Sequence, residues 1–536
     1  MRAWTLRIGF AGLLIWAGLR TRAEAPGSLH VDIREPAMVC ITSLQDHQWR
    51  VPPDGSAVPA YSKLRDFYNP KPWQPGQIGY VRLTSAEPRD NQARVAIYQG
   101  QSSYPYWKEP AAYFVSQPFS ISLPAGKWRL AIARGLEFEP HYEEFAVAAG
   151  SAINRTVALK RWVDMPKTGW FSGDTHVHFP RMTPEQSEFL LTWARAEDVH
   201  LASILHMGDS KAEYFEQAAY GPASRYQKGD YAIATGQEDP RTDIAEQGHC
   251  IALNITVPVR DVAKYHLYDT MFDGVRQQPG ALAGYAHLAW ASDQFHKPEA
   301  TWDPTINAIR GKVDFFEVLQ FRHLGVADFY DFLNLGIRLA AVAGSDLPWG
   351  STIGEVRTFA YTGSRFTPEA WYDAVKHGRT FVTNGPMLDF AVDGKRAGDE
   401  VRLAKPGKVR IHARAWAAES IGAVNSLEVI ADGRVIRTAA GDADFTLDAD
   451  RSQWLAVRAT SVNGAFAHTS PVYVIVGGAS VRDTDAASIA QRKLKELDYI
   501  TAKIAELREY RNEQTALLER IAAARVIYQG LLSKGE

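Results

Sequence analysis

The residues with the clearest capacity for chemistry are two histidines in the segment Gly173-Asp-Thr-His-Val-His178. His176 and His178 are separated by one residue and follow the apolar pair Trp170-Phe171. Residues i and i+2 of a strand project to the same side, so both imidazoles can bind one metal ion. The motif therefore predicts a metal site if further ligands lie at the ends of later strands.

Polar residues of the ligand type stand next to several short apolar runs further along the chain. His206 follows 201–205, Glu238 follows 231–234, His249 opens 249–253, His287 follows 281–286, Glu317 follows 313–316 and Asp346 follows 339–343. The carboxyl ends of parallel strands gather at one face of an α/β domain, where these side chains would converge. Nitrogen and oxygen ligands without a dedicated thiolate suit Zn, Mn or Fe. A carboxylate can bridge two such ions, and we expect Glu238 to be the bridge.

Each of these residues also has an ordinary structural interpretation. His206, beside Met207, could be a buried histidine with satisfied hydrogen bonds. Glu317 could pair with Arg322, and Asp346 could cap a turn. Their joint occurrence at successive strand ends favours a shared site over separate coincidences.

The elements that must position these residues lie between about 166 and 386. The short apolar runs alternate there with helical stretches such as 184–197 and 327–335. Near-continuous apolar strands that alternate with helices predict a buried, mostly parallel sheet, which can close into a barrel.

The segments on either side of this region have strand patterns. Residues 28–165 predict a β-sandwich, in which 119–123 is a strand, 124–126 a turn and 128–133 the returning strand. Residues 387–480 predict a second, smaller sandwich. Its turns are expected at Asp393-Gly394, Asp432-Gly433 and Asn463-Gly464.

The C-terminal segment 484–533 predicts a long helix. Leu497, Ile500, Ile504 and Leu507 follow heptad spacing, which Arg511 and Gln514 interrupt. Two interpretations stay open: a helix packed against its own protein, or a coiled coil that forms a homodimer.

Residues 1–25 predict a signal peptide. Arg2 and Arg7 precede an apolar run of twelve residues, 8–19, and Ala23-Glu-Ala25 offers a cleavage site. We therefore expect an exported protein, periplasmic or extracellular, with no other membrane attachment; an uncleaved anchor is the alternative. A formal net charge of −2 and no basic run exclude nucleic acid as an expected partner. The two cysteines, Cys40 and Cys250, are not expected to form a disulfide.

The motifs together resemble the CehA/McbA-like family within the PHP (polymerase and histidinol phosphatase) superfamily of metallohydrolases. The resemblance covers roughly residues 120–390. It is carried by 173–178, Glu238 with Gly248-His-Cys-Ile-Ala-Leu253, Ala286-His287, Glu317, Gly344-Ser-Asp346 and Gly378-Arg-Thr-Phe-Val-Thr-Asn-Gly-Pro386. It implies a PHP-like distorted (β/α) barrel flanked by two β-sandwich domains, with the C-terminal long helix after them.

The resemblance also implies a set of metal ligands. His176, His178, Glu238 and Asp346 would hold one ion, and Glu238, His249 and His287 a second. A third site would need a histidine two residues after Asp346, where this sequence has Pro348, and an acid near the first motif, where it has only Glu185. We therefore expect two divalent ions, Zn or Mn, with Fe also suitable.

The expected function is that of an exported metal-dependent hydrolase acting on a small-molecule substrate. A metal-bound hydroxide would attack an ester, carbamate, amide or phosphoester. Asp346 would accept the proton of the nucleophile, and His206 or His323 would protonate the leaving group. Trp349, Arg322, His323 and Tyr220 are candidate rim residues.

Two alternatives stay open. An amidohydrolase barrel also begins with His-x-His, but we find no lysine at a strand end of 166–386. A non-catalytic surface protein could bind polysaccharide or protein through its sandwiches, with a degenerate barrel between them.

Overall fold

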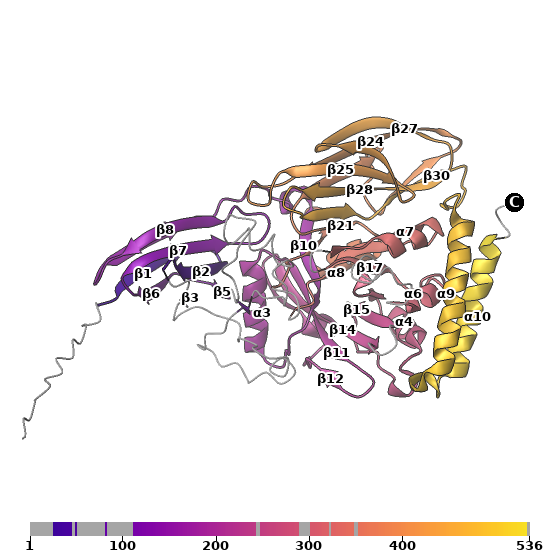
Figure 1. Cartoon of the computed structure of the whole chain (residues 1–536), viewed down its shortest axis with the longest axis horizontal. Helices are drawn as coiled ribbons and strands as arrows, with labels where there is room; N and C mark the ends of the chain where they lie inside the picture. Colours follow the sequence, from indigo (N-terminus) through magenta and orange to yellow (C-terminus); the bar gives the residue numbers. More distant parts are fainter. Residues whose placement is uncertain are drawn as a thin grey trace, which may run out of the picture.

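The chain folds mainly into β-sheets, with seven α-helices among the residues that the structure describes (Figure 1). This computed structural model describes residues 25–45, 49–50, 81–82, 111–242, 247–288, 301–320, 323–347 and 352–532. Residues 1–24, which hold most of the predicted signal peptide, lie outside these ranges, as do Arg322, Pro348 and Trp349. Among the described helices, none is long and apolar enough to cross a membrane.

The N-terminal part consists of two facing sheets around one apolar core (Figure 1). One sheet contains β1 (Gly27–Ile33), β6 (Phe119–Leu123) and β9 (Ala152–Val157). The other contains β2 (Ala37–Ser43), β3 (Trp49–Arg50), β4 (Val81–Arg82), β5 (Ala111–Val115), β7 (Gly126–Ala133) and β8 (His141–Val147). In β6 every second residue is buried, as expected for a strand with one face on the core.

The turn at 124–126 does not form the hairpin that the sequence predicts. Strand β6 pairs with β1, whereas β7 pairs with β2 and β8, so the turn connects the two sheets. Trp128 explains the geometry, because its indole Nε1 donates to Pro124 O at 3.0 Å and its side chain enters the core between the sheets.

The central part is organised around seven strands, which we call the strand ring. They are β10 (Trp170–Val177), β11 (Leu201–Gly208), β14 (Tyr231–Thr242), β15 (Gly248–Leu253), β16 (Leu282–Tyr285), β17 (Phe315–Gln320) and β19 (Ala340–Ala343). Each strand pairs with the next in this order, and a bridge between Val177 and Leu347 leads from the end of β19 back to β10.

Strand β15 is the one strand of this ring that runs against its neighbours. It is antiparallel to both β14 and β16, whereas the other pairings in the ring are parallel. The chain between Thr242 and Gly248 is too short for a crossover helix, and a parallel return needs a dozen or more residues. His249, at the start of β15, therefore lies beside the later half of β14.

The described residues of the central part form five α-helices, and capping side chains mark the start of two of them. The five helices are α3 (Pro184–Ala196), α4 (Tyr268–Arg276), α6 (Asp303–Asn307), α7 (Ala327–Asn334) and α8 (Pro368–Lys376). Thr183 caps α3 in a reciprocal pair with Gln186, and Thr367 caps α8 by accepting from Ala370 N. Both helices carry proline at their first position, where its missing N–H costs nothing.

The C-terminal β region also contains two sheets. A three-stranded sheet holds β22 (Met387–Val392), β24 (Gly407–Trp416) and β27 (Asp442–Ala449). Facing it are β23 (Glu400–Leu403), β25 (Val424–Ala431), β26 (Arg434–Ala439), β28 (Gln453–Ser461), β29 (Phe466–Thr469) and β30 (Val472–Val476). Two of the predicted turns have left-handed backbone at both residues, Asp393-Gly394 and Asp432-Gly433.

Strand pairing continues from the central part into this C-terminal region. Strand β10 pairs with β20 (Arg357–Tyr361), β20 with β21 (Thr380–Thr383), and β21 with β29. The two parts are therefore joined by backbone hydrogen bonds on either side of residue 386.

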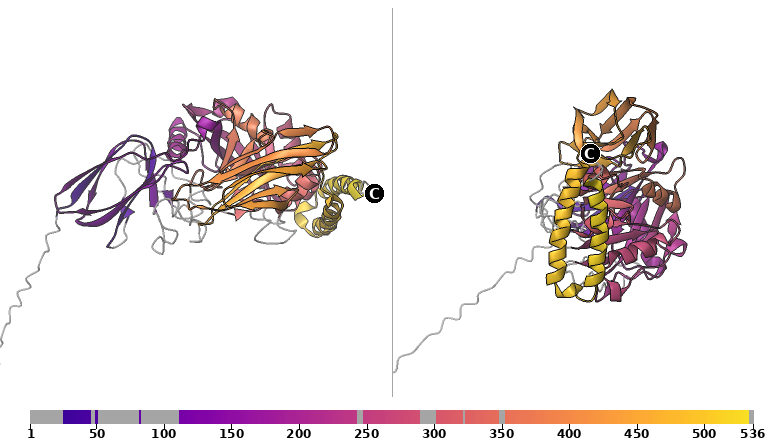
Figure 2. Two further views of the ribbon diagram at one scale, coloured as in Figure 1. Left: turned by 90° about the horizontal axis from the view of Figure 1, so that it is seen from above. Right: turned by 90° about the vertical axis from the view of Figure 1, so that its right-hand side faces the viewer.

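The C-terminal tail is a pair of helices, where the sequence predicts one. Helices α9 (Ala486–Glu506) and α10 (Gln514–Leu532) lie side by side as an antiparallel hairpin (Figure 2). Between them Tyr510 is fully buried, with its ring centroid 4.8 Å from that of His266. Tyr510 thus anchors the connection between the two helices. The chain reverses direction there, where Arg511 and Gln514 interrupt the heptad pattern.

Candidate metal centre

Six predicted ligands from five strands or strand ends meet at one point of the strand ring. His176 lies on β10 and His178 one residue beyond it, Glu238 lies on β14, and His249 lies on β15. His287 and Asp346 follow β16 and β19 by two and three residues. All lie within three overlapping groups whose ligand atoms are within 4.8 Å of one another.

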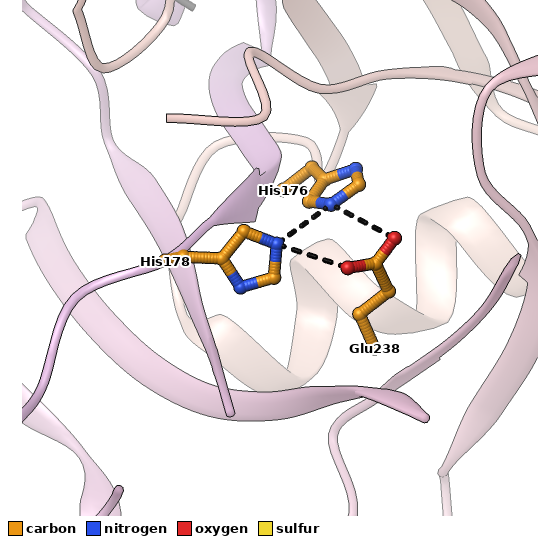
Figure 3. Close-up of side chains that lie close together, drawn as sticks. All are labelled: His176, His178 and Glu238. Atoms are coloured by element: carbon orange, nitrogen blue, oxygen red, sulfur yellow. Dashed lines mark hydrogen bonds and ion pairs between the residues drawn. The ribbon is translucent and has the colours of Figure 1, made fainter. Parts of the chain in front are cut away.

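The first group surrounds the paired histidines. The Nε2 atoms of His176 and His178 are 3.0 Å apart, and Glu238 Oε2 is 3.2 Å from His178 Nε2 (Figure 3). Asp346 Oδ1 is 3.3 Å from His176 Nε2 and 3.5 Å from His178 Nε2. Two nitrogens and two carboxylates thus face one small volume.

The second group lies on the other side of Glu238. Its Oε1 atom is 2.8 Å from His249 Nδ1 and 3.1 Å from His287 Nε2. Glu238 Oε2 therefore faces His178, whereas Oε1 lies closest to His249 and His287 and 3.7 Å from His176 Nε2. The carboxylate could therefore take part in metal binding with the histidines of both groups.

Hydrogen bonds behind the rings orient three of the four imidazoles. His176 Nδ1 donates to Glu317 Oε2 at 2.9 Å, His178 Nδ1 to Leu205 O at 3.2 Å, and His287 Nδ1 to Gln320 Oε1 at 2.9 Å. With Nδ1 donating to these acceptors, each ring would present the lone pair of Nε2 toward Glu238 once its Nε2 carries no proton. The facing Nε2 atoms and carboxylate oxygens are then all acceptors, so the donor set fits divalent cations.

The backbone at two of the ligands adopts the left-handed region. His287 has φ 62° and Asp346 has φ 50°, values that are uncommon for residues other than glycine. Such strain concentrates at functional sites, where the surroundings maintain it. Around Asp346 the turn is held by buried Asp174, whose carboxylate accepts from Ser345 N and Gly354 N at 3.0 and 2.7 Å. Gly344 is required too, since a Cβ there would lie 2.3 Å from His176 Cβ.

The charges of the site compensate one another. Burial disfavours the charged form of His176, but Asp346, Glu317 and Glu238 outweigh it and raise its pKa well above the ordinary value. Burial works against ionisation of Glu238 as well, yet His249 and His176 hold its pKa well below the ordinary value. Glu238 is therefore ionised, and the neighbouring histidines balance its charge.

Two predicted catalytic residues lie outside the ligand groups. His206 Nδ1 is 3.1 Å from the Tyr220 hydroxyl, and its Nε2 is 3.7 Å from Asp239 Oδ2. His323, on β18 (His323–Leu324), is half-buried and pairs across strands with Gln320, the partner of His287. Glu185 is exposed in the first turn of α3, away from all three groups.

Sequence reasoning missed the positioning residues Asp174 and Gln320. Asp174 stands inside the His-x-His motif, which was the available signal. Nothing in the sequence distinguished Gln320 from an ordinary strand residue. Cys40 and Cys250 are both buried, and they are not joined in a disulfide.

Comparisons with known proteins add little to this geometry. No protein-family model matches the chain, and no curated protein matches it. Among solved structures, PsfC from Pseudomonas syringae PB-5123 is similar at 16% identity over 38% of this chain and 88% of its own, with a TM-score of 0.26. Fibronectin(III)-like modules of Clostridium thermocellum CbhA are similar at 15% identity over 24% of this chain and 64% of theirs, with a TM-score of 0.13.

Proposed function

We propose that the chain is a metal-dependent hydrolase of the PHP type, similar to the CehA/McbA-like family, with two divalent ions in its site. The observation that carries the proposal is the position of Glu238, whose two oxygens face different sets of histidines at 3.2 and 2.8 Å. Zn and Mn suit four imidazoles and two carboxylates, and Fe is also compatible.

The arrangement of strands supports the same assignment. The predicted ligands stand on or just beyond members of the strand ring, and the Val177–Leu347 bridge brings the last of these strands back to the first. A distorted (β/α) barrel between two β-sandwiches would place them in this way.

Divalent ions in such a site lower the pKa of bound water to about 7 and so supply a nucleophile at neutral pH. The residues around them hold and move protons. We assign Asp346 as the proton acceptor, because its carboxylate faces the same volume as His176 and His178, with Oδ1 at 3.3 and 3.5 Å from their Nε2 atoms. His206 and His323 are the candidates for protonating a leaving group, and separate asparagine variants of each distinguish them.

The substrate class follows from this chemistry. We propose a small molecule with an ester, carbamate, amide or phosphoester bond, hydrolysed in the periplasm or outside the cell. The location depends on the signal segment in residues 1–25, most of which lies outside the described residues.

A substrate screen tests the function. Metal-stripped protein is assayed with p-nitrophenyl acetate, a p-nitrophenyl carbamate and p-nitrophenyl phosphate, before and after addition of Mn²⁺ or Zn²⁺. We expect metal-restored hydrolysis of at least one substrate, its loss in His178→Ala, and its retention in the control His412→Ala, which changes a half-exposed histidine on β24. An activity that persists in His178→Ala, or none with any substrate, would contradict the proposal.

A further inference from the structure

A cavity of about 270 Å³ lies at the seam between the central part and the C-terminal β region. We call it the arginine pocket. It is lined from the α7–β19 connection by Gly336 and Arg338, from β23 by Glu400 and Arg402, from β30 by Tyr473, and by the loop that ends at Arg482. The volume is near the lower end of the range for small-molecule sites.

The arginine pocket carries more positive than negative charge. Three guanidinium groups, those of Arg338, Arg402 and Arg482, line it with a single carboxylate, Glu400. Glu400 pairs with both Arg338 and Arg402, and Arg338 also lies 4.6 Å from the centre of the Tyr473 ring. One carboxylate cannot neutralise three guanidinium groups, so the pocket favours a further anion.

Arg482 has one guanidinium donor without a partner in the described part of the chain. Its Nε atom is buried and has no hydrogen-bond acceptor among the described residues. A buried donor without an acceptor is destabilising, and native structures rarely leave one so. The backbone at Gly336 lets the side chain of Arg482 pack closely against it. Gly336 has φ +88°, and a Cβ there would lie 3.4 Å from Arg482 Cγ.

We propose that the arginine pocket binds a small anion that offers carboxylate or phosphate oxygens. Arg338, Arg402 and Arg482 supply the positive charge, and a guanidinium group has planar donors that match two such oxygens. The volume of about 270 Å³ limits the ligand to a small molecule.

This site is separate from the metal centre. Arg338 stands two residues before β19, whereas Asp346 stands three residues after its other end. The strand therefore separates the pocket from the ligands, and the inference holds whether or not the proposed hydrolysis is correct.

Calorimetric titration of the full chain with inorganic phosphate and with malonate, at constant ionic strength set with chloride, tests the proposal. We expect saturable binding of phosphate, malonate or both, and their relative affinities tell the two oxygen chemistries apart. Arg482→Gln should weaken it about tenfold through loss of charge-assisted hydrogen bonds. Arg482→Lys should weaken it too, because lysine keeps the charge but lacks the planar donors.

Two controls make the result specific. Arg414→Gln changes an exposed arginine on β24 that pairs with one carboxylate, Asp442, and should leave binding unchanged. His176→Ala, which alters the metal centre, should also retain it. The proposal is overturned if neither anion binds saturably, if Arg482→Gln binds as the wild type does, or if His176→Ala abolishes binding.

Discussion

At the scale of single residues, the candidate site depends on one carboxylate. Glu238 lies 2% exposed between two sets of histidines, and no other acidic side chain in the described part of the site faces both sets as closely. The six predicted ligands could be chosen from the sequence because each stands at or just after an apolar run. Their positioning partners could not, because Asp174 and Gln320 act through contacts that exist only once distant strands are adjacent.

Glu317 is predicted to tune the site through His176. Its Oε2 accepts from His176 Nδ1 and its Oε1 from the backbone N of His287 at 3.3 Å. Glu317→Gln keeps the shape but removes the charge that makes His176 a good donor to a cation. We expect metal affinity to fall about 10–100-fold, measured by competition with a chelator.

The control for that variant is Glu428→Gln on β25, which removes a carboxylate paired with Arg458 far from the ligand groups. It should bind metal as the wild type does. Equal affinities in Glu317→Gln and the wild type would show that Glu317 has no influence on the ligands.

At the scale of elements, local patterns predicted most strands and helices but not every pairing. The runs at 201–205, 231–234 and 281–286 are strands, and 184–197 and 327–335 are essentially helical. The hairpin predicted at 124–126 was wrong, because turn residues show where a chain bends but not which sheet the next strand joins. The tail divides into α9 and α10 because Tyr510 is buried against distant residues, a contact with no local signal.

The junction between α7 and β29 is predicted to weaken in acid. His468 is fully buried, donates from Nδ1 to Thr469 O and lies 2.6 Å from the Tyr330 hydroxyl through Nε2. Burial, with a contribution from Arg458, lowers the pKa of His468 to about 3. The unfolded chain takes up this proton near pH 6.5, so stability from the neutral ring is complete above pH 6.5 and is lost as the pH falls toward 3.

Comparison of the wild type with His468→Gln measures this effect. Urea denaturation gives the free energy of unfolding of each protein. The difference between the two should shrink by about 2 kcal/mol between pH 7 and pH 5. Between pH 8 and pH 7 it should hardly change, because the ring is mainly neutral in both states. A difference independent of pH down to 5 would refute the assignment.

At the scale of the whole molecule, ionic contacts join parts that are far apart in sequence. Arg161, next to the N-terminal sandwich, pairs with Glu137 at 2.7 Å and with buried Asp198 of the central part at 2.9 Å. Strand and helix patterns predict separate parts of the chain. They do not predict this junction, since Arg161, Glu137 and Asp198 share no sequence pattern. Leu497, Ile500 and Ile504 are buried within the same chain, so a homodimer through the tail would use other residues, such as exposed Val526.

The central claim is that the protein has a two-ion centre bridged by Glu238. The metal content of the protein tests this claim most directly. Elemental analysis of wild-type protein loaded with Zn²⁺ or Mn²⁺ and then desalted should find about two ions per chain. Glu238→Ala should hold fewer than about one, since the bridge contributes to both positions. The control Glu428→Ala should match the wild type. Fewer than about one ion per wild-type chain, or equal content in Glu238→Ala, would contradict the account and favour a non-catalytic binding protein.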